Sequence, residues 1–395
     1  MRTIAITTPG FYPGEADAIT RHLLDGDFWR VHIRKPDADP GALRALIEEI
    51  PASLRPRLTI HYNHDIAGEY GLGGIHLSRR APLPPRQWQG LVSRSLHTLS
   101  EVRTLSGCHY AFLSPIFPSI SKPGYTPSIP HDDITALLRS RSDGSIPVFA
   151  LGGVTPESLP QLAAMGFGGA AMLGAAWRPC VSPSRFRLQF ITHATPRYTV
   201  TQGARMALEG GCRWIQLRMK DATQADLLLA GREIAAMCRD FKATFIIDDH
   251  VELVHTLGAD GVHLGLTDMP VPEARTLLGP GKIIGATANT LQHMVSAADA
   301  GADYIGLGPF RFTRTKTNLS PILGLQGYSD LITRFGARLP VVAIGGITPS
   351  DIPTLLPTGI SGVAVSSAIL SDPDPAALTA TLLNSLSHIT SPTTC

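Results

Sequence analysis

The sequence contains the same domain twice, and this duplication limits the fold more than any other feature. The segment at residues 343–349 (AIGGITP) matches 150–156 (ALGGVTP), and 261–264 (GVHL) matches 74–77 (GIHL). The matching segments are 193 and 187 residues apart. Such a distance is the length of a whole domain, whereas a solenoid repeat spans about 20–50 residues. The chain of 395 residues therefore divides into two domains, and each is long enough to bury a core.

The second copy alternates short apolar segments with helix-like segments. Uninterrupted apolar segments of this kind are typical of strands buried on both faces of a parallel sheet. Residues 222–239 and 291–300 are two of the helix-like segments, and Gly301 is a suitable end for the latter. We expect eight strands, at 188–192, 214–217, 244–247, 261–264, 283–286, 304–307, 341–344 and 362–365.

Eight consecutive strand-then-helix units in one domain predict the α/β class and a closed (β/α)₈ barrel. A doubly wound sheet is the alternative, but no G-x-G-x-x-G motif opens a helix after the first strand. The first copy shows the same alternation, but the ends of its apolar segments are less clearly marked. A proline- and serine-rich segment at 178–184 interrupts the pattern of both copies. We therefore predict two tandem (β/α)₈ TIM barrels, at residues 1–182 and 187–395.

Composition excludes several classes of function. A net charge of +2 without a run of lysine or arginine does not indicate a basic surface that binds nucleic acid. No segment approaches the ~20 apolar residues of a membrane span, and residues 1–7 resemble a first strand more than a signal peptide. The five cysteines are scattered and include no C-x-x-C, as expected of reduced thiols. We expect a cytoplasmic protein that binds small molecules, and a homo-oligomer is an open alternative.

Cationic and amide side chains follow the second strand of the second copy. In (β/α)₈ barrels the chemistry lies on the loops after the strands. Gln216, Arg218 and Lys220 alternate along the chain there, so that all three can share one face. Two cations and an amide suit a polyanion such as diphosphate, and a solvated edge with chance charges is the alternative.

Carboxylates follow the next two strands. Asp248 and Asp249 come after the third strand, and Asp268 comes after the fourth. Magnesium is bound by one or two carboxylates together with substrate phosphate oxygens, so these loops predict a Mg²⁺ site. The alternative is that the aspartates only serve turns or helix caps.

The last three strands precede a second group of candidate anion ligands. The loop at 313–317 (TRTKT) alternates hydroxyls with cations, and Gly346 and Ser366-Ser367 follow the last two strands. Glycine lets backbone amides approach an anion, and barrels commonly keep a phosphate here, although the glycines can also serve a tight turn. Together the loops predict a diphosphate–metal site and a monophosphate site, which suggests two phosphorylated substrates, one of which loses diphosphate.

With these residues the second copy resembles thiamine phosphate synthase over 187–385. The matching segments are 216–220, 247–249, 261–268, 285–290, 306–316, 344–347 and 365–369. The resemblance implies that hydroxymethylpyrimidine diphosphate is joined to a thiazole phosphate with release of diphosphate. In that family Mg²⁺ and cations stabilise the departing diphosphate, and the thiazole nitrogen captures the pyrimidine methylene cation.

The resemblance also assigns roles, with Arg218, Lys316 and Thr287 as the catalytic residues. The pyrimidine diphosphate would be held by Gln216, Arg218, Lys220 and Lys316, and its pyrimidine ring would contact Asp248 and Thr287. The Mg²⁺ ion would be bound by Asp249 and Asp268. The thiazole would contact Thr313 and Thr315, and its phosphate would be bound by Gly346, Ser366 and Ser367. The sequence departs from the family at three places: Asp248 replaces a usual Asn, Thr287 replaces a usual Ser, and Leu266-Thr267 replaces a polar-acidic pair before Asp268.

The first copy resembles the TenI-like thiazole tautomerases, through 31–34, 93–98, 114–122 and 152–153. Diphosphate ionisation is not expected there, since the acidic positions are lost. A tautomerase needs a proton shuttle, and His97 suits that role because histidine titrates near neutral pH. An inactive packing or dimerisation module is the alternative. In place of Asp248, Asp249, Asp268 and Lys220 the first copy has His61, Tyr62, Ala81 and Pro36.

Two other functions remain as alternatives for the whole chain. A regulator or carrier could bind thiamine precursors without catalysis, but phosphate binding alone does not need the acidic pair. Another phosphate-binding barrel enzyme, such as an isomerase, would not explain the cations beside two metal carboxylates. The sequence therefore predicts a Mg²⁺-dependent thiamine phosphate synthase in the second copy, and a tautomerase or an inactive relative in the first.

Overall fold

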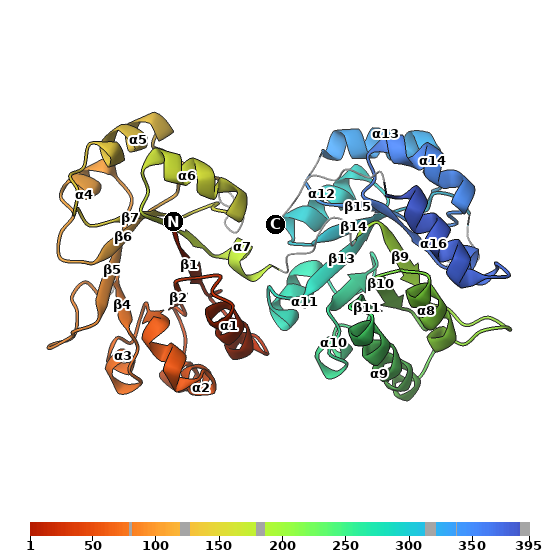
Figure 1. Ribbon diagram of the computed structural model, residues 1–395, viewed down its shortest axis with the longest axis horizontal. Coiled ribbons are helices and arrows are strands. Elements are labelled where there is room, and N and C mark those ends of the chain that lie inside the picture. Colours follow the sequence, from red (N-terminus) through yellow and green to blue (C-terminus); the bar gives the residue numbers. More distant parts are fainter. Residues whose placement is uncertain (79–80, 119–126, 179–185, 313–320, 337, 388–395) are drawn as a thin grey trace. The chain divides into compact units, whose positions relative to one another are not determined.

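The computed structural model describes residues 1–78, 81–118, 127–178, 186–312, 321–336 and 338–387. The chain divides into two compact units between Arg178 and Pro179, at one end of the predicted join. Each unit is a closed barrel of eight parallel strands with helices around the outside (Figure 1). The predicted tandem (β/α)₈ fold is confirmed, and the doubly wound alternative is wrong because both sheets close.

In the first barrel the strands pair in chain order, and β8 closes on β1. The strands are β1 (Arg2–Ile6), β2 (Arg30–Ile33), β3 (Leu58–Ile60), β4 (Gly74–Leu77), β5 (Leu91–Leu96), β6 (Tyr110–Leu113), β7 (Val148–Ala150) and β8 (Gly169–Met172). The helices are α1 (Glu15–Leu24), α2 (Pro40–Glu49), α3 (Asp65–Glu69), α4 (Leu99–Arg103), α5 (His131–Arg139), α6 (Leu159–Met165) and α7 (Gly174–Trp177).

The second barrel has the same strand order, and β16 closes on β9. Its strands are β9 (Leu188–Ile191), β10 (Trp214–Leu217), β11 (Thr244–Asp248), β12 (Gly261–Leu264), β13 (Ile283–Ala288), β14 (Tyr304–Leu307), β15 (Val341–Ala343) and β16 (Gly362–Val365). Its helices are α8 (Val200–Glu209), α9 (Gln224–Asp240), α10 (Leu253–Thr256), α11 (Val271–Leu278), α12 (Leu291–Asp299), α13 (Gly324–Phe335), α14 (Ile352–Leu355), α15 (Ser367–Leu370) and α16 (Pro375–Ser385).

Each barrel buries apolar side chains on both faces of its strands, which explains the uninterrupted apolar segments in the sequence. One core lies between strands and helices, and a smaller one fills the barrel. In the second barrel the inner core includes Trp214 and Tyr304, whose rings lie edge to face with centroids 4.9 Å apart. The barrel is therefore a packed core, and ligands are left with the loops at its carboxyl end.

Among the described residues, no helix combines the length and the apolar character needed to span a bilayer.

Candidate active sites

The carboxyl ends of β10 and β11 join three of the predicted site residues of the second barrel. The Gln216 amide donates to one oxygen of Asp248, and Arg218 Nε lies 3.0 Å from the other oxygen. The backbone N–H of Arg218 also donates to Thr192 Oγ1, at 3.0 Å. Asp248 thus holds an amide and a guanidinium in fixed positions, and the Gln216 Oε1 is buried without a hydrogen-bond partner.

The predicted metal ligands, Asp249 and Asp268, share a hydrogen bond between their carboxyl groups. Burial, the charge of Asp248 and this hydrogen bond raise the pKa of Asp249 to about 8, and Arg218 opposes the shift. The Gly265 N–H donates to the other side of the pair, at 2.6 Å from Asp268 Oδ2. Two carboxyl groups in hydrogen-bond contact form an oxygen donor set that fits a hard divalent cation.

A chain of hydrogen bonds crosses the interior of the second barrel and ends at Thr287. His263 Nε2 lies 3.0 Å from Thr287 Oγ1, and His263 Nδ1 lies 2.9 Å from the Tyr304 hydroxyl. Gln189 donates to the same hydroxyl at 3.3 Å. Sequence reasoning missed His263 and Gln189 as site residues. The signal was present, because each is a polar residue inside an otherwise apolar strand.

The predicted phosphate-binding residues, Gly346, Ser366 and Ser367, include one that contacts the end of the first strand of its barrel. The Ser366 hydroxyl donates to the Ile191 carbonyl at 2.5 Å and lies 2.6 Å from His193 Nδ1. Gly346 has φ +70°, and a Cβ there would lie 2.5 Å from Arg311 Cγ, so glycine is needed both for backbone conformation and for the adjacent loop. Ser367 begins α15. Sequence reasoning also missed His193, which follows the first strand directly.

The structure describes only one of the remaining predicted residues of this barrel. Lys220 is exposed beyond β10. Thr313, Thr315 and Lys316 lie outside the described residues, so their positions stay predictions.

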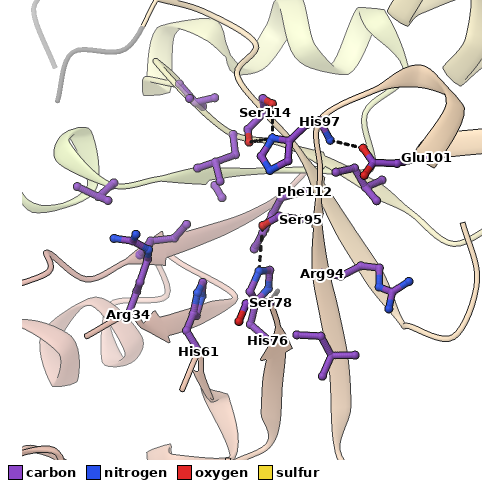
Figure 2. Close-up of a pocket in the computed structure, with 18 of the residues that line it drawn as sticks. Arg34, His61, His76, Ser78, Arg94, Ser95, His97, Glu101, Phe112 and Ser114 are labelled. Atoms are coloured by element: carbon purple, nitrogen blue, oxygen red, sulfur yellow. Dashed lines mark hydrogen bonds between the residues drawn. The ribbon is translucent and has the colours of Figure 1, made fainter. Parts of the chain in front are cut away.

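The first barrel has a cavity of about 800 Å³ at the carboxyl end of its strands (Figure 2). Arg34, Arg94 and His97 line it. His97 Nδ1 lies 3.0 Å from the Ser114 carbonyl. A carbonyl can only accept, so Nδ1 carries the proton and Nε2 is left as the basic nitrogen. The Glu101 carboxylate accepts from the backbone N–H of His97 at 2.7 Å and forms a capping box with Thr98 at the start of α4, which fixes the loop.

Three buried histidines lie beside this cavity. His32 Nδ1 is 2.9 Å from His61 Nε2, and the rings of His61 and His76 stack with centroids 4.1 Å apart. Burial and the neighbouring imidazoles lower the pKa of His32 and His61 well below the usual value, and burial lowers that of His76 to about 3. All three rings are therefore neutral at pH 7.

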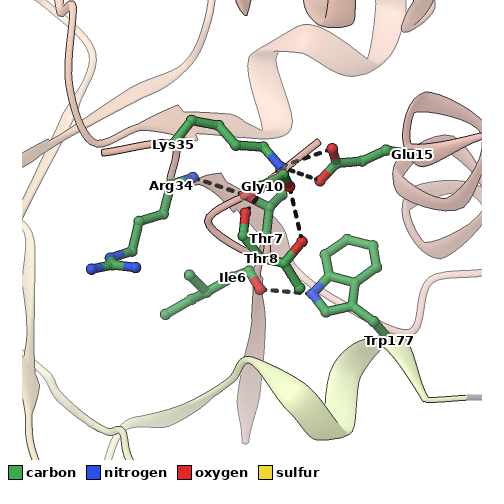
Figure 3. A network of polar contacts seen from close by, with 8 residues as sticks. All are labelled: Ile6, Thr7, Thr8, Gly10, Glu15, Arg34, Lys35 and Trp177. Atoms are coloured by element: carbon green, nitrogen blue, oxygen red, sulfur yellow. Dashed lines mark hydrogen bonds and ion pairs between the residues drawn. The ribbon is translucent and has the colours of Figure 1, made fainter. Parts of the chain in front are cut away.

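A buried ion pair holds the loop after β1 against the loop after β2 (Figure 3). Lys35 Nζ lies 2.7 and 2.8 Å from the two oxygens of Glu15 and also donates to the Thr8 carbonyl, at 2.9 Å. The next residue back, Arg34, donates its backbone N–H to Thr7 Oγ1 at 2.9 Å. These contacts position the Arg34 side chain at the cavity, and sequence reasoning missed them.

Comparison with known proteins identifies relatives of both halves. The family model described as thiamine monophosphate synthase matches residues 3–176 and, separately, residues 188–369. The thiamine-phosphate synthase of Bacteroides fragilis is 53% identical over 200 residues, which are 50% of this chain and 98% of that protein. The enzyme of the same name from Phocaeicola vulgatus is 56% identical over 200 residues, 50% of this chain and 96% of that protein. Among solved structures, thiamine phosphate pyrophosphorylase from Pyrococcus furiosus is 32% identical with a TM-score of 0.48, over 53% of this chain and 98% of that one.

Proposed function

The chain belongs to the thiamine monophosphate synthase family, and we propose that its second barrel carries out the synthase reaction of thiamine biosynthesis. In this transfer the pyrimidine methylene carbon loses diphosphate and forms a bond to the nitrogen of a thiazole phosphate. One observation supports the choice of barrel above the others. The carboxyl groups of Asp249 and Asp268 meet beside Arg218 in the second barrel, whereas the first barrel has Tyr62 and Ala81 at the acidic positions.

Asp249 and Asp268 would hold a Mg²⁺ ion. The fit is supported by their donor chemistry, since two carboxyl groups already in hydrogen-bond contact are hard oxygen ligands. When bound, the ion would supply positive charge that stabilises the oxygens of the leaving diphosphate.

Other residues of the second barrel would bind the diphosphate and the pyrimidine. Arg218 and Lys220 supply cations for the diphosphate, and Asp248 fixes the guanidinium of Arg218 through the 3.0 Å contact. The buried, unpartnered Oε1 of Gln216 is an acceptor for an amino group such as that of an aminopyrimidine. The Thr287 hydroxyl, oriented by His263, faces the same ligand from β13. The assignments of Lys316, Thr313 and Thr315 to substrate binding rest on the resemblance alone.

The ends of β15 and β16 would receive the thiazole phosphate. Gly346 keeps the backbone of its loop accessible, and Ser367 stands at the start of α15. The Ser366 hydroxyl is already engaged by Ile191 and His193, so its contribution to the phosphate would come from its backbone or from a rearranged hydroxyl.

The test is a direct assay of the purified full-length chain with both substrates. We expect thiamine phosphate to form with Mg²⁺ and its rate to fall to background when a chelator removes divalent cations. A chain that is folded and makes no product under any divalent cation would contradict the proposal.

For the first barrel a second function is favoured by its cavity, namely proton transfer on a thiazole phosphate. Arg34 and Arg94 would hold the anion, and the basic Nε2 of His97 would move the proton. His97→Gln should slow isomerisation of a thiazole carboxylate phosphate by ~10²–10⁴-fold while ligand binding is kept. If the chain binds this ligand but gives no rate above buffer, the first barrel is an inactive relative. The cytoplasmic location and a homo-oligomeric state stay predictions.

A further inference from the structure

We propose that His32, His61 and His76 of the first barrel bind one transition-metal ion of the Zn²⁺ type beside the cavity. Neither the synthase reaction nor the proton transfer proposed above requires this site.

The three side chains have the geometry of a ligand set. One ring nitrogen of each lies within 4.8 Å of the others, and all three residues are buried. In a tetrahedral zinc site with Zn–N bonds of 2.0–2.1 Å, the ligand nitrogens lie about 3.4 Å apart. His32 Nδ1 and His61 Nε2 are already 2.9 Å apart. Small rotations of the rings would therefore complete the site without movement of the strands.

The hydrogen bonds around His76 leave one nitrogen for the ion. The Ser93 hydroxyl donates to the Ile75 carbonyl at 3.3 Å, so it accepts from the His76 Nδ1–H at 2.8 Å. The lone pair is then on Nε2, which lies 3.0 Å from Ser95 Oγ (Figure 2). Ser95 is exposed, and its hydroxyl can turn away when an ion takes that lone pair.

His32 can change tautomer without loss of a hydrogen bond. Its Nε2 lies 2.7 Å from the Tyr110 hydroxyl, which can donate or accept. When His32 and His61 bind each other, one ring nitrogen must carry the shared proton. On metal binding His32 would hold its proton at Nε2 and donate it to Tyr110, so that Nδ1 faces the ion. Such an outer hydrogen bond is what orients metal-binding histidines in proteins.

The fourth coordination position would open to the cavity. His61 and His76 line that cavity together with Arg34 and Arg94, whereas His32 lies fully buried behind them. An ion held by three imidazoles with one open position is the arrangement of catalytic rather than structural zinc. The two arginines indicate that the exchangeable ligand is an anion, either a carboxylate or a phosphate.

The positions of the second barrel that correspond to the three histidines carry different polar side chains. The strand registers align His32 with Gln216, His61 with Asp248 and His76 with His263. The second barrel thus keeps one imidazole and has an amide and a carboxylate at the other two positions. Three nitrogen ligands select transition metals, whereas the oxygen ligands proposed at Asp249 and Asp268 suit Mg²⁺.

The test is a titration of the chelator-stripped, full-length chain with Co²⁺, which reports tetrahedral coordination through its visible absorption bands. In excess Mg²⁺, which would fill the proposed site at Asp249 and Asp268, we expect one Co²⁺ per chain, bound at the first barrel. The double variant His32→Gln/His61→Asp reproduces the residues of the second barrel and should bind Co²⁺ at least ~10²-fold more weakly. The control variant His131→Gln removes another imidazole of the same barrel and should leave the Co²⁺ affinity unchanged.

A single His76→Gln variant guards against misfolding of the double variant, and synthase activity reports separately on the second barrel. The proposal is overturned if the folded chain binds no Co²⁺, if both cluster variants bind it as the unaltered chain does, or if Mg²⁺ displaces it. The last outcome would place the ion at Asp249 and Asp268.

Discussion

The two barrels share a backbone but differ in the polar groups at their second, third and fourth strands. The first barrel has His32, His61 and His76 where the second has an amide, a carboxylate and one histidine. Both groups are hydrogen-bonded within their own barrel, and all of their members are buried except Asp248, which is half-buried. The two barrels show that a strand register can be preserved while the polar side chains at the strand ends change, and function in this fold lies at those ends.

A second difference concerns how each barrel supports the loop that carries its arginine. In the first barrel Arg34 precedes the buried Lys35, which pairs with Glu15. In the second barrel Arg218 precedes Met219, and Arg218 is instead held by Asp248. The first barrel therefore depends on a buried charge pair for its shape, and the second uses a pair inside the site itself.

The largest expected effect comes from breaking that buried pair. Lys35→Met introduces the residue of the second barrel and leaves the buried Glu15 carboxyl group without its cationic partner. Removing one member of a buried ion pair costs about 3–5 kcal/mol in the free energy of unfolding. Three of the four tryptophans (Trp29, Trp88 and Trp177) lie in the first barrel, so denaturant unfolding followed by fluorescence reports mainly on it.

The double variant Lys35→Met/Glu15→Val separates charge from packing. Val200 begins α8 as Glu15 begins α1, so this variant copies the second barrel at both positions. It should recover most of the lost stability, because replacing both charges by apolar groups is often neutral. A single variant as stable as the unaltered chain would show that the pair does not hold the loop.

The next expected effect is that the stability of the two barrels depends on pH in opposite directions. The pKa of each clustered histidine is lowered by burial, so below about pH 6.5 the unfolded first barrel binds protons that the folded barrel does not. Its stability should fall by about 1.4 kcal/mol per histidine for each pH unit, from about pH 6.5 downward. His32→Gln/His61→Asp should flatten this profile, and an unchanged profile would mean that other groups cause acid unfolding.

In the second barrel the shift has the other sign. The pKa of Asp249 is raised to about 8, so its contribution to stability is present at low pH and is lost as the pH rises toward 8. Mg²⁺ must displace the Asp249 proton, so Mg²⁺ affinity should increase up to about tenfold per pH unit below pH 8. Calorimetric titration at pH 6, 7 and 8 measures this, and an affinity independent of pH would exclude Asp249 as a ligand.

Much of this fold could be predicted from sequence because strand position is a local property. The apolar segments and the Gly-Gly motifs repeat in order, and the observed ends of the second-barrel strands differ by two residues at most, at β13. The meeting of Asp249 with Asp268 was also predictable, since consecutive strands of a barrel are neighbours.

The remaining features depend on register and closure. Whether His32 contacts His61 depends on which residues face the interior of two strands, and the pairing of Ser366 with His193 joins positions 173 residues apart. The Lys35–Glu15 pair requires a helix start to lie over a loop, and no local pattern encodes that contact. Polar residues inside apolar strands were the available signal for the histidines.

If the synthase reaction depends on the acidic pair of the second barrel, loss of both carboxylates should abolish most of the rate. The measurement is the rate of thiamine phosphate formation by the full-length Asp249→Asn/Asp268→Asn variant in saturating Mg²⁺, with Tyr62→Phe in the first barrel as the matched control. We expect the double variant to lose at least ~10²-fold in rate, about 3 kcal/mol of transition-state stabilisation, and the control to keep its rate. A folded double variant that turns over at nearly the unaltered rate would show that the acidic pair does not carry the reaction.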